Sequence, residues 1–373
     1  MKKPNNAFLL YGYHSPEYFC GRKKELTELK NHRLNERNVA LYSWRGMGRS
    51  ALIHRFLMEE ERKGKLEAIY VDLTGTVTLT KCIEIIIKGI FERYLKSVNS
   101  INTDFQRILT SIAVNITTHK KTNVPQFNLG YRTQNQLIDN LNTLGQFLSL
   151  RKKKIYVVFK EFQQIANYEE AQTAKILSNF SKKFASIRFI FSGSHRHKMV
   201  FMFTDQNQAF NRSCQLISLD PVHIDEFTPF IQKHFKAVNR KISTEQIQEV
   251  YSWTRGQTQA IQLICNKLYA MEGETSTVGL REIFHEVLQE NALVFANYHR
   301  LLSKVQWKLI IAIAKENEVE KPQSATFLAK YNLGAASSIK VALEALITKE
   351  LVIAENGKFY VHDLLFFRWL EQL

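Results

Sequence analysis

The stretch NVALYSWRGMGRSALIHRF, residues 38–56, limits the possible folds more than any other part of this 373-residue chain. It begins with an apolar run, continues through a short loop with two glycines, and ends in apolar residues at helical spacing. A buried strand that leads through a tight glycine loop into a helix is typical of loops that bind phosphate through backbone N–H groups. The stretch therefore predicts an α/β fold with a phosphate-binding loop after its first strand.

The loop matches the phosphate-binding pattern GxxxxGK[ST] only in part. Gly48 and Ser50 keep the second glycine and the hydroxyl residue of the pattern. Ser43 stands where the pattern has its first glycine, and Arg49 stands where it has its lysine. Taken alone, the stretch is equally compatible with an ordinary turn between a strand and a helix.

Two further motifs follow in the order expected of a nucleotide-hydrolysing sheet. The apolar run in IYVVFKEFQQI, residues 155–165, has the form of a Walker B strand. Lys160 replaces the aspartate that orders magnesium, whereas Glu161 keeps the place of the carboxylate that activates water. The next apolar run, FIFSGS, ends in Ser192 and Ser194, at the kind of strand end where ligands bind in open α/β sheets.

Short β-branched and aromatic runs at 68–73, 154–159 and 187–194 alternate with helical stretches. This alternation predicts parallel βαβ units and a sheet covered on both faces. The polar segment from about 100 to 133 interrupts the pattern, and we expect an insertion or a hairpin over the sheet there.

From about Pro221 onward, apolar residues recur at i, i+3 and i+4, which predicts helices with one buried face. Gly256 is expected to end one of these helices. The stretch MEGETSTVG, residues 271–279, is interpreted as a linker. Beyond it, three helical stretches are followed by a strand, an Asn-Gly turn and a second strand, which predicts a winged helix-turn-helix.

Together these motifs resemble the archaeal-type ATPases of the STAND branch of P-loop NTPases, and especially a set of bacterial relatives. The family patterns FxxRExE and SPRRMGKT are matched by FCGRKKEL, residues 19–26, and by SWRGMGRS. The patterns DEFQQI and FIFSGSxRHxM are matched by KEFQQI, residues 160–165, and by FIFSGSHRHKM, residues 189–199. ISLDPV and the terminal DLLFFRWL are also similar, so the resemblance covers nearly the whole chain.

The resemblance implies an α/β fold with three parts, in the manner of origin-recognition-like AAA+ proteins. A RecA-like P-loop NTPase domain with a parallel sheet is expected over 1–220. A helical lid domain is expected over 221–275, and a C-terminal winged-helix domain over 280–373.

The resemblance also implies a nucleotide site with ATP or ADP as the cofactor. The phosphate-binding residues would be Gly46, Met47, Gly48, Arg49, Ser50 and Ala51. Arg22 would lie near the base, Glu161 would be the catalytic carboxylate, and Ser192 or Ser194 would sense the γ-phosphate. Arg212, in the sequence FNR, matches a catalytic arginine of archaeal members, with a surface arginine as an equal alternative.

The departures from the family pattern bear on the chemistry. The guanidinium of Arg49 can pair with phosphate, but it is bulkier than the ammonium of a lysine. Lys160 places a positive charge where magnesium should bind, so the metal is repelled and hydrolysis should be impaired. Lys160 would instead bind the nucleotide together with Arg49, since the two place fixed positive charges near the same phosphates. We therefore expect a nucleotide, if bound, to be bound without magnesium. The lid stretch Gly256-Gln257-Thr258 also lacks the proline of a Gly-x-Pro motif.

The composition is that of an ordinary globular protein. The four cysteines have no metal-ligand spacing, and His195 and His197 at i, i+2 cannot share a helical face, so we expect no metal site. No apolar run approaches the length of about 18 residues that a membrane helix needs. We expect a cytoplasmic protein without a membrane partner.

The formal charge of +16 suggests an acidic partner. The excess lies in the middle of the chain, where residues 120–198 carry 14 Lys and Arg against 4 Asp and Glu. One interpretation is a basic face of the ATPase domain that binds nucleic acid or another polyanion, and the other is a solvated basic surface. The third helical stretch of the winged helix, residues 335–351, has only two lysines, so this domain is expected to bind duplex DNA poorly and to pack on the ATPase domain or on a protein partner.

Three functions remain open from the sequence. The first is a regulatory, ATP-binding protein of the AAA/STAND type with impaired hydrolysis. The second is an active ATPase in which Arg49 and Glu161 suffice. The third is a nucleotide-free scaffold that binds nucleic acid or protein.

Overall fold

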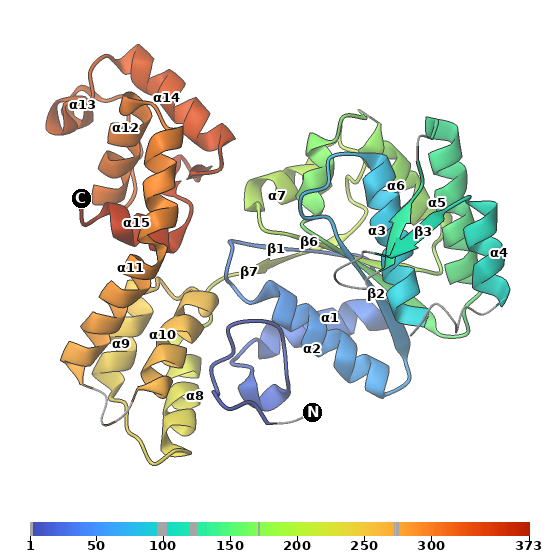
Figure 1. Ribbon diagram of the computed structural model, residues 1–373, viewed down its shortest axis with the longest axis horizontal. Helices are drawn as coiled ribbons and strands as arrows, with labels where there is room; N and C mark the ends of the chain where they lie inside the picture. Colours follow the sequence, from blue (N-terminus) through green and yellow to red (C-terminus); the bar gives the residue numbers. More distant parts are fainter. Residues whose placement is uncertain are drawn as a thin grey trace. The chain divides into compact units, whose positions relative to one another are not determined.

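The computed structural model describes residues 3–94, 103–118, 125–130, 132–170, 172–271, 273 and 276–373. The chain forms two compact units (Figure 1). Tyr11–Val222 make up the first, here called the α/β unit. Met1–Leu10 and His223–Leu373 make up the second, here called the helical unit.

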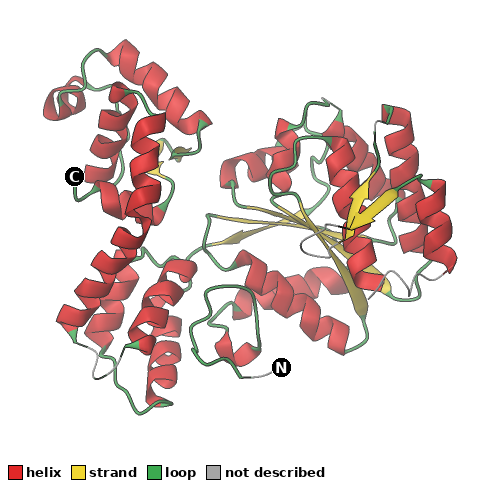
Figure 2. Ribbon diagram, in the orientation of Figure 1, coloured by secondary structure: helices red, strands yellow, loops and turns green. Residues whose placement is uncertain are grey.

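The α/β unit is built on five parallel strands in the order β2-β5-β6-β1-β7. The strands are β1 (Val39–Ser43), β2 (Leu66–Asp72), β5 (Lys154–Lys160), β6 (Arg188–Gly193) and β7 (Gln215–Leu219). Figure 2 shows these strands in yellow with helices above and below them. The α/β class and the parallel sheet predicted from the sequence are confirmed.

Helices cover both faces of this sheet, so each strand is buried on two sides (Figure 1). One face carries α1 (Lys23–Leu34) and α2 (Arg49–Arg62). The other carries α3 (Leu79–Tyr94), α5 (Gln134–Ser149), α6 (Thr173–Lys183) and α7 (Arg196–Thr204). Neighbouring residues of a strand face opposite cores: Leu41 packs with α1 and α2, and Ala40 packs with the helices of the other face. Burial on both sides explains why the strands are continuous apolar runs.

The carboxyl ends of three neighbouring strands are aligned. Asp72 on β2 is the Cα partner of Lys160 on β5, and Lys160 is the partner of Ser192 on β6. Ser192 is in turn the partner of Leu41, two residues before the end of β1. Because all of these strands are parallel, residues that follow them come together at one edge of the sheet.

A two-stranded antiparallel hairpin follows α4 (Thr103–Ser111) and consists of β3 (Asn115–Thr118) and β4 (Pro125–Asn128). It lies in the segment predicted to be an insertion or hairpin, of which residues 100–102, 119–124 and 131 lie outside the described residues. Phe127 packs on α3 through the ring of Phe91, with 5.0 Å between the ring centroids.

The helical unit begins with α8 (Ile224–Lys236), α9 (Thr244–Trp253) and α10 (Thr258–Ala270). Gly256, with φ +68°, follows α9 as the sequence predicts. The N-terminal residues pack here, and not in the domain over 1–220 that the sequence suggested. The ring of Phe8 is buried against the aromatic rings of Phe235 and Tyr269, and the side chain of Asn6 donates to the carbonyl of Asn266 at 2.9 Å.

A 25-residue helix, α11 (Thr277–Leu301), includes residues 277–279 of the stretch interpreted as a linker. The linker prediction is therefore wrong for these residues. Its buried residues, including Leu280, Ile283, Phe284 and Val287, follow helical spacing. The Gly- and Thr-rich start of the stretch obscured this pattern in the sequence.

The winged helix consists of α12 (Lys304–Lys315), α13 (Ala325–Tyr331), α14 (Ala336–Thr348), β8 (Val352–Glu355), β9 (Lys358–Val361) and α15 (Leu364–Leu370). The turn between its two strands has positive φ at Asn356 (+52°) and Gly357 (+77°), as expected for an Asn-Gly hairpin. These elements enclose one apolar core, and the predicted winged helix is confirmed. In the described part of the chain, no helix is both long and apolar enough to cross a membrane.

Candidate functional site

The loop between β1 and α2 has the backbone shape that a phosphate-binding loop needs. Gly46 and Gly48 adopt the left-handed conformation, with φ of +75° and +81°, which a residue with a side chain adopts at a cost. Gly48 is the N-cap of α2, so the N–H groups of Ser50 and Ala51 lie in the first turn of that helix. Helix N-termini of this kind attract anions through their unpaired N–H groups and the helix dipole.

Arg22 supports this loop. The residue caps α1 in a left-handed conformation with its side chain buried, and its Nη2 donates to the carbonyl of Met47 at 2.8 Å. Its Nη1 forms an ion pair with Glu25 at 2.6 Å. The structure thus places Arg22 in contact with the loop backbone, and its predicted position near the base stays a prediction.

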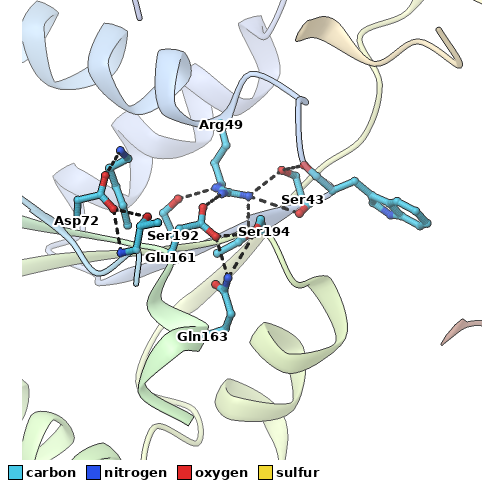
Figure 3. A network of polar contacts seen from close by, with 11 residues as sticks. Ser43, Arg49, Asp72, Glu161, Gln163, Ser192 and Ser194 are labelled. Atoms are coloured by element: carbon cyan, nitrogen blue, oxygen red, sulfur yellow. Dashed lines mark hydrogen bonds and ion pairs between the residues drawn. The ribbon is translucent and has the colours of Figure 1, made fainter. Parts of the chain in front are cut away.

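The side chain of Arg49 extends from the first turn of α2 to the carboxyl ends of three strands (Figure 3). Nε donates to Ser192 Oγ at 2.7 Å, and Nη1 donates to the carbonyl of Gly193 at 2.6 Å and to Ser43 Oγ at 3.1 Å. Nη2 forms an ion pair with Glu161 Oε1 at 2.6 Å. The guanidinium therefore ties β1, β5 and β6 together at the edge where a ligand would bind.

These contacts leave Arg49 little capacity for a ligand. A guanidinium has five N–H groups, and four of those in Arg49 are directed at protein acceptors. Burial lowers the pKa of Arg49 from its ordinary value, while the charge of Glu161 opposes this effect. Even with a lowered pKa, an arginine stays protonated.

Glu161 follows β5 in a left-handed conformation with φ +52°. Its Oε2 accepts hydrogen bonds from Ser194 Oγ and from Gln163 Nε2, the latter at 2.8 Å, while Oε1 faces Arg49. Burial alone would raise the pKa of Glu161, but Arg49, Ser194 and Gln163 together lower it below its ordinary value. The carboxylate is thus ionised, and both of its oxygens are engaged.

Gln163 was not predicted from the sequence, although it lies in the quoted motif EFQQI. The side chain is buried, and its amide also lies 3.3 Å from Ser194 Oγ. A Cβ atom added at Gly193 would come within 2.6 Å of the Gln163 oxygen and 2.4 Å of Met199, so the end of β6 is closely packed. The sequence gives no sign that Gln163 and Ser194 donate to Glu161, and only the folded structure shows it.

Lys160 does not join the Arg49–Glu161 pair. Its Nζ lies 2.6 Å from Oδ2 of Asp72 on the neighbouring strand, and the other Asp72 oxygen accepts from the backbone N–H and hydroxyl of Thr74 (Figure 3). Burial raises the pKa of Asp72, but Lys160 and Thr74 outweigh this effect and lower it. Asp72 was not predicted as part of the site.

Arg212 lies in the exposed turn before β7, where its backbone N–H donates to the carbonyl of Phe203 at 3.0 Å. Among the described residues, its side chain makes no hydrogen bond or ion pair with the residues at the strand ends. Its catalytic role stays a prediction from the resemblance.

The residues at this edge do not fit a magnesium ion. Magnesium in nucleotide sites is bound through one or two carboxylates together with substrate phosphates. Here Asp72 and Glu161 are paired with Lys160 and Arg49, so the four side chains carry no net charge. No three His, Cys, Asp or Glu residues gather into a possible metal site in the described ranges.

Two family models match the chain. One, described as "ATPase domain predominantly from Archaea", matches residues 19–264. The other, described as "Probable winged helix domain", matches residues 293–372. No curated protein matches the sequence.

Solved structures share the fold of the whole chain. A Walker-type ATPase of Pyrococcus abyssi is similar with a TM-score of 0.66 and 16% identity over 98% of this chain and 99% of that one. The ORC2 protein of Aeropyrum pernix, in ADPNP and ADP complexes, has a TM-score of 0.58 and 14% identity over 94% and 92%. The ORC1 protein of the same organism, in complex with DNA, has a TM-score of 0.53 and 10% identity over 99% and 96%. At these identities the likeness shows the fold.

Proposed function

The chain belongs to the family of ATPase domains found predominantly in Archaea, and on that premise we propose that it is a regulatory nucleotide-binding protein with impaired hydrolysis. The ion pair between Arg49 and Glu161 is the observation that carries this proposal. It joins the residue in place of the Walker lysine to the carboxylate expected to activate water.

Hydrolysis of a nucleotide needs a base that can orient water and cations that neutralise the charge of the transition state. Glu161 is poorly suited to activate a water molecule, because both of its oxygens already accept hydrogen bonds from Arg49, Ser194 and Gln163, and these donors lower its pKa and weaken it as a base. Lys160 is held by Asp72 and cannot bridge phosphate oxygens as a metal does. Both requirements are therefore poorly met.

Binding of phosphate depends on a different set of groups. The backbone N–H groups of residues 46–51 and the N-terminus of α2 hold phosphate oxygens in a loop of this shape. Gly46 and Gly48 keep the left-handed conformations that direct these groups. Nucleotide binding is thus supported by the backbone, while the side chains oppose turnover.

The test compares binding and turnover in the full-length protein. Calorimetric titration with nucleotide, with magnesium and with EDTA, should give the same affinity in both, and phosphate release should be negligible. The double substitution Arg49→Lys with Lys160→Asp restores the family residues and should make binding depend on magnesium and produce measurable hydrolysis. Arg55→Lys is the matched control, because Arg55 lies on the same helix and pairs with Glu59.

Other outcomes decide between the remaining functions. Turnover by the unmodified protein would establish an active ATPase and refute the proposal. Absence of binding of any nucleotide would indicate a nucleotide-free scaffold. The N–H groups of Arg49 that donate to Ser192 and Gly193, and so are not directed at a ligand, favour this alternative.

The proposed partners follow from charge. The basic run at residues 151–154 leads into β5 of the α/β unit, which begins at Lys154, and we propose that it contacts nucleic acid or another polyanion. Carboxylates compensate part of it, since Lys154 lies 2.8 Å from Glu36 and Lys153 lies 4.0 Å from Glu67. Changing Lys152, Lys153 and Lys154 to glutamate should weaken polyanion binding without unfolding the protein, and unchanged binding would leave only a solvated surface.

A further inference from the structure

We propose that this site selects nucleoside diphosphates over triphosphates and binds them without a divalent cation, because the Arg49–Glu161 pair fills the space that a third phosphate needs. This inference rests on the proposed nucleotide binding and names the ligand class. It concerns only the α/β unit, in which every residue involved lies.

The loop and the strand ends serve different phosphates. In a phosphate-binding loop, the backbone N–H groups surround the inner phosphates, and the lysine side chain reaches toward the outermost one. The residue in the lysine position here is Arg49, and its guanidinium is bonded to the carbonyl of Gly193 and the hydroxyl of Ser192 at the end of β6. The backbone part of the site is retained, whereas the part for the outermost phosphate is occupied.

The guanidinium cannot turn toward a ligand without loss. An arginine binds phosphate best through two parallel N–H groups, and Arg49 has at most one that is not directed at a protein acceptor. Releasing a second N–H would leave an oxygen of this buried or partly buried set of acceptors without its donor: Glu161, Gly193, Ser43 or Ser192.

Charge acts in the same direction. Glu161 is ionised and neutralises Arg49, so the pair offers a third phosphate no net positive charge. A magnesium ion would normally neutralise that phosphate, but Lys160, in the metal-ordering position, is held by Asp72.

The backbone acceptor of Arg49 lies in a closely packed layer. A Cβ atom at Gly193 would meet Met199 at 2.4 Å and the Gln163 oxygen at 2.6 Å, so the backbone that accepts from Arg49 rests on a packed layer. Met199 is fully buried and Gln163 nearly so. The acceptor of Arg49 at the end of β6 is therefore held in place, which opposes rearrangement of its hydrogen bonds.

The experiment measures the affinities of the full-length protein for ADP, ATP and AMP by calorimetry, in EDTA and in magnesium. We expect ADP to bind at least about tenfold more tightly than ATP, with no effect of magnesium. Glu161→Gln removes the negative charge but keeps an acceptor for Arg49, and it should reduce the preference for ADP by about tenfold. Glu60→Gln is the control. Glu60, on α2, is also buried, and it forms an ion pair with an arginine, Arg33 of α1.

The outcomes separate the inference from the proposed function. ATP binding as tight as ADP binding, without turnover, overturns the inference and leaves the proposed function intact. An equal loss of preference in Glu161→Gln and Glu60→Gln also overturns it, since the effect would then be general. No binding of any nucleotide by the folded protein, with the fold verified by circular dichroism, overturns both.

Discussion

The ammonium group of Lys160 lies 2.6 Å from a carboxylate oxygen of Asp72, and the two residues are Cα partners at the ends of β5 and β2. The lysine that replaces the metal-ordering aspartate thus has its own carboxylate on the neighbouring strand. Both side chains are partly exposed, at 31% and 47%, so the pair contributes little to stability, about 0.2–1 kcal/mol. Its main effect is to hold the positive charge away from the Arg49–Glu161 pair.

Exchanging this lysine for an acid should create a cation site. Lys160→Asp places a second carboxylate opposite Asp72, and like charges facing each other across neighbouring strands repel. We expect a lower melting temperature than in the unmodified protein in EDTA, and an increase of about 2–4 °C on adding magnesium. Differential scanning fluorimetry would measure both values.

Lys160→Asn is the control, because it removes the ammonium without adding a carboxylate. Magnesium should then have no effect on the melting temperature. If magnesium stabilises the unmodified protein as much as Lys160→Asp, Lys160 is not the group that excludes the cation.

Local features of the sequence were sufficient to predict the sheet and the loop. The strands are continuous apolar runs, and the left-handed residues of the loop are glycines, Gly46 and Gly48. Both signals depend on neighbours in sequence. The location of Glu161 beside the loop also followed, since Walker motifs meet at one edge of a parallel sheet.

The ion pairs of the charged residues at the strand ends could not be predicted from neighbouring residues in the sequence. Lys160 and Asp72 are 88 positions apart and meet only because β2 pairs with β5. Likewise, the 112 positions between Arg49 and Glu161 gave no indication that the two would pair instead of facing a ligand. The apolar residues of helix α11 have helical spacing, but its Gly- and Thr-containing start is typical of a linker.

The stability contributed by Glu161 should depend on pH. Its pKa is lowered in the folded protein, so its contribution is complete above the ordinary glutamate value of 4.5 and is lost as pH falls through the folded value. Glu161→Gln lacks this titration, and at pH 7 it should lower the free energy of unfolding by about 1–3 kcal/mol.

Urea unfolding of both proteins between pH 7 and pH 3 would measure the difference. We expect a constant difference above about pH 5 that narrows below it. A difference that stays unchanged down to pH 3 would show that the carboxylate is not stabilised in its ionised form by Arg49.

The winged helix should bind duplex DNA poorly. The exposed residues of α14 include Ser337, Ser338, Val341 and Glu344, with Lys340 as the only exposed basic residue of this described helix. Phosphate neutralisation by several basic residues provides most of the affinity for DNA. Lys340→Glu in the full-length protein should therefore change DNA binding less than about twofold, measured by fluorescence anisotropy at several salt concentrations.

A large loss of affinity in Lys340→Glu, with a shallower dependence on salt, would contradict this expectation. Lys304→Glu, at the start of α12, is a control for the general effect of reversing one charge in the same domain.

Arg368 of α15 joins the winged helix to the end of α9. Its Nε donates to the carbonyl of Trp253 at 2.8 Å and its Nη2 to the carbonyl of Ser252 at 3.2 Å, where a cation opposes the negative end of the helix dipole. Arg255, just beyond α9, lies over the ring of Phe367, with 3.5 Å from its Cζ atom to the ring centroid. Two kinds of interaction thus connect α9 and α15: hydrogen bonds from a guanidinium to helix carbonyls, and a cation–π contact.

Arg368→Gln should therefore lower the free energy of unfolding by about 1–2 kcal/mol, because charged donors to two carbonyls are lost. Hydrogen exchange should become faster at the end of α9 and in α15, and stay unchanged in the sheet of the α/β unit. Arg281→Gln is the matched control, since the Arg281 side chain is 72% exposed and its pair with Glu249 should contribute less than about 1 kcal/mol. Equal destabilisation by both substitutions would mean that Arg368 contributes only a surface charge, because a partly buried cap on α9 should cost more to remove than an exposed ion pair.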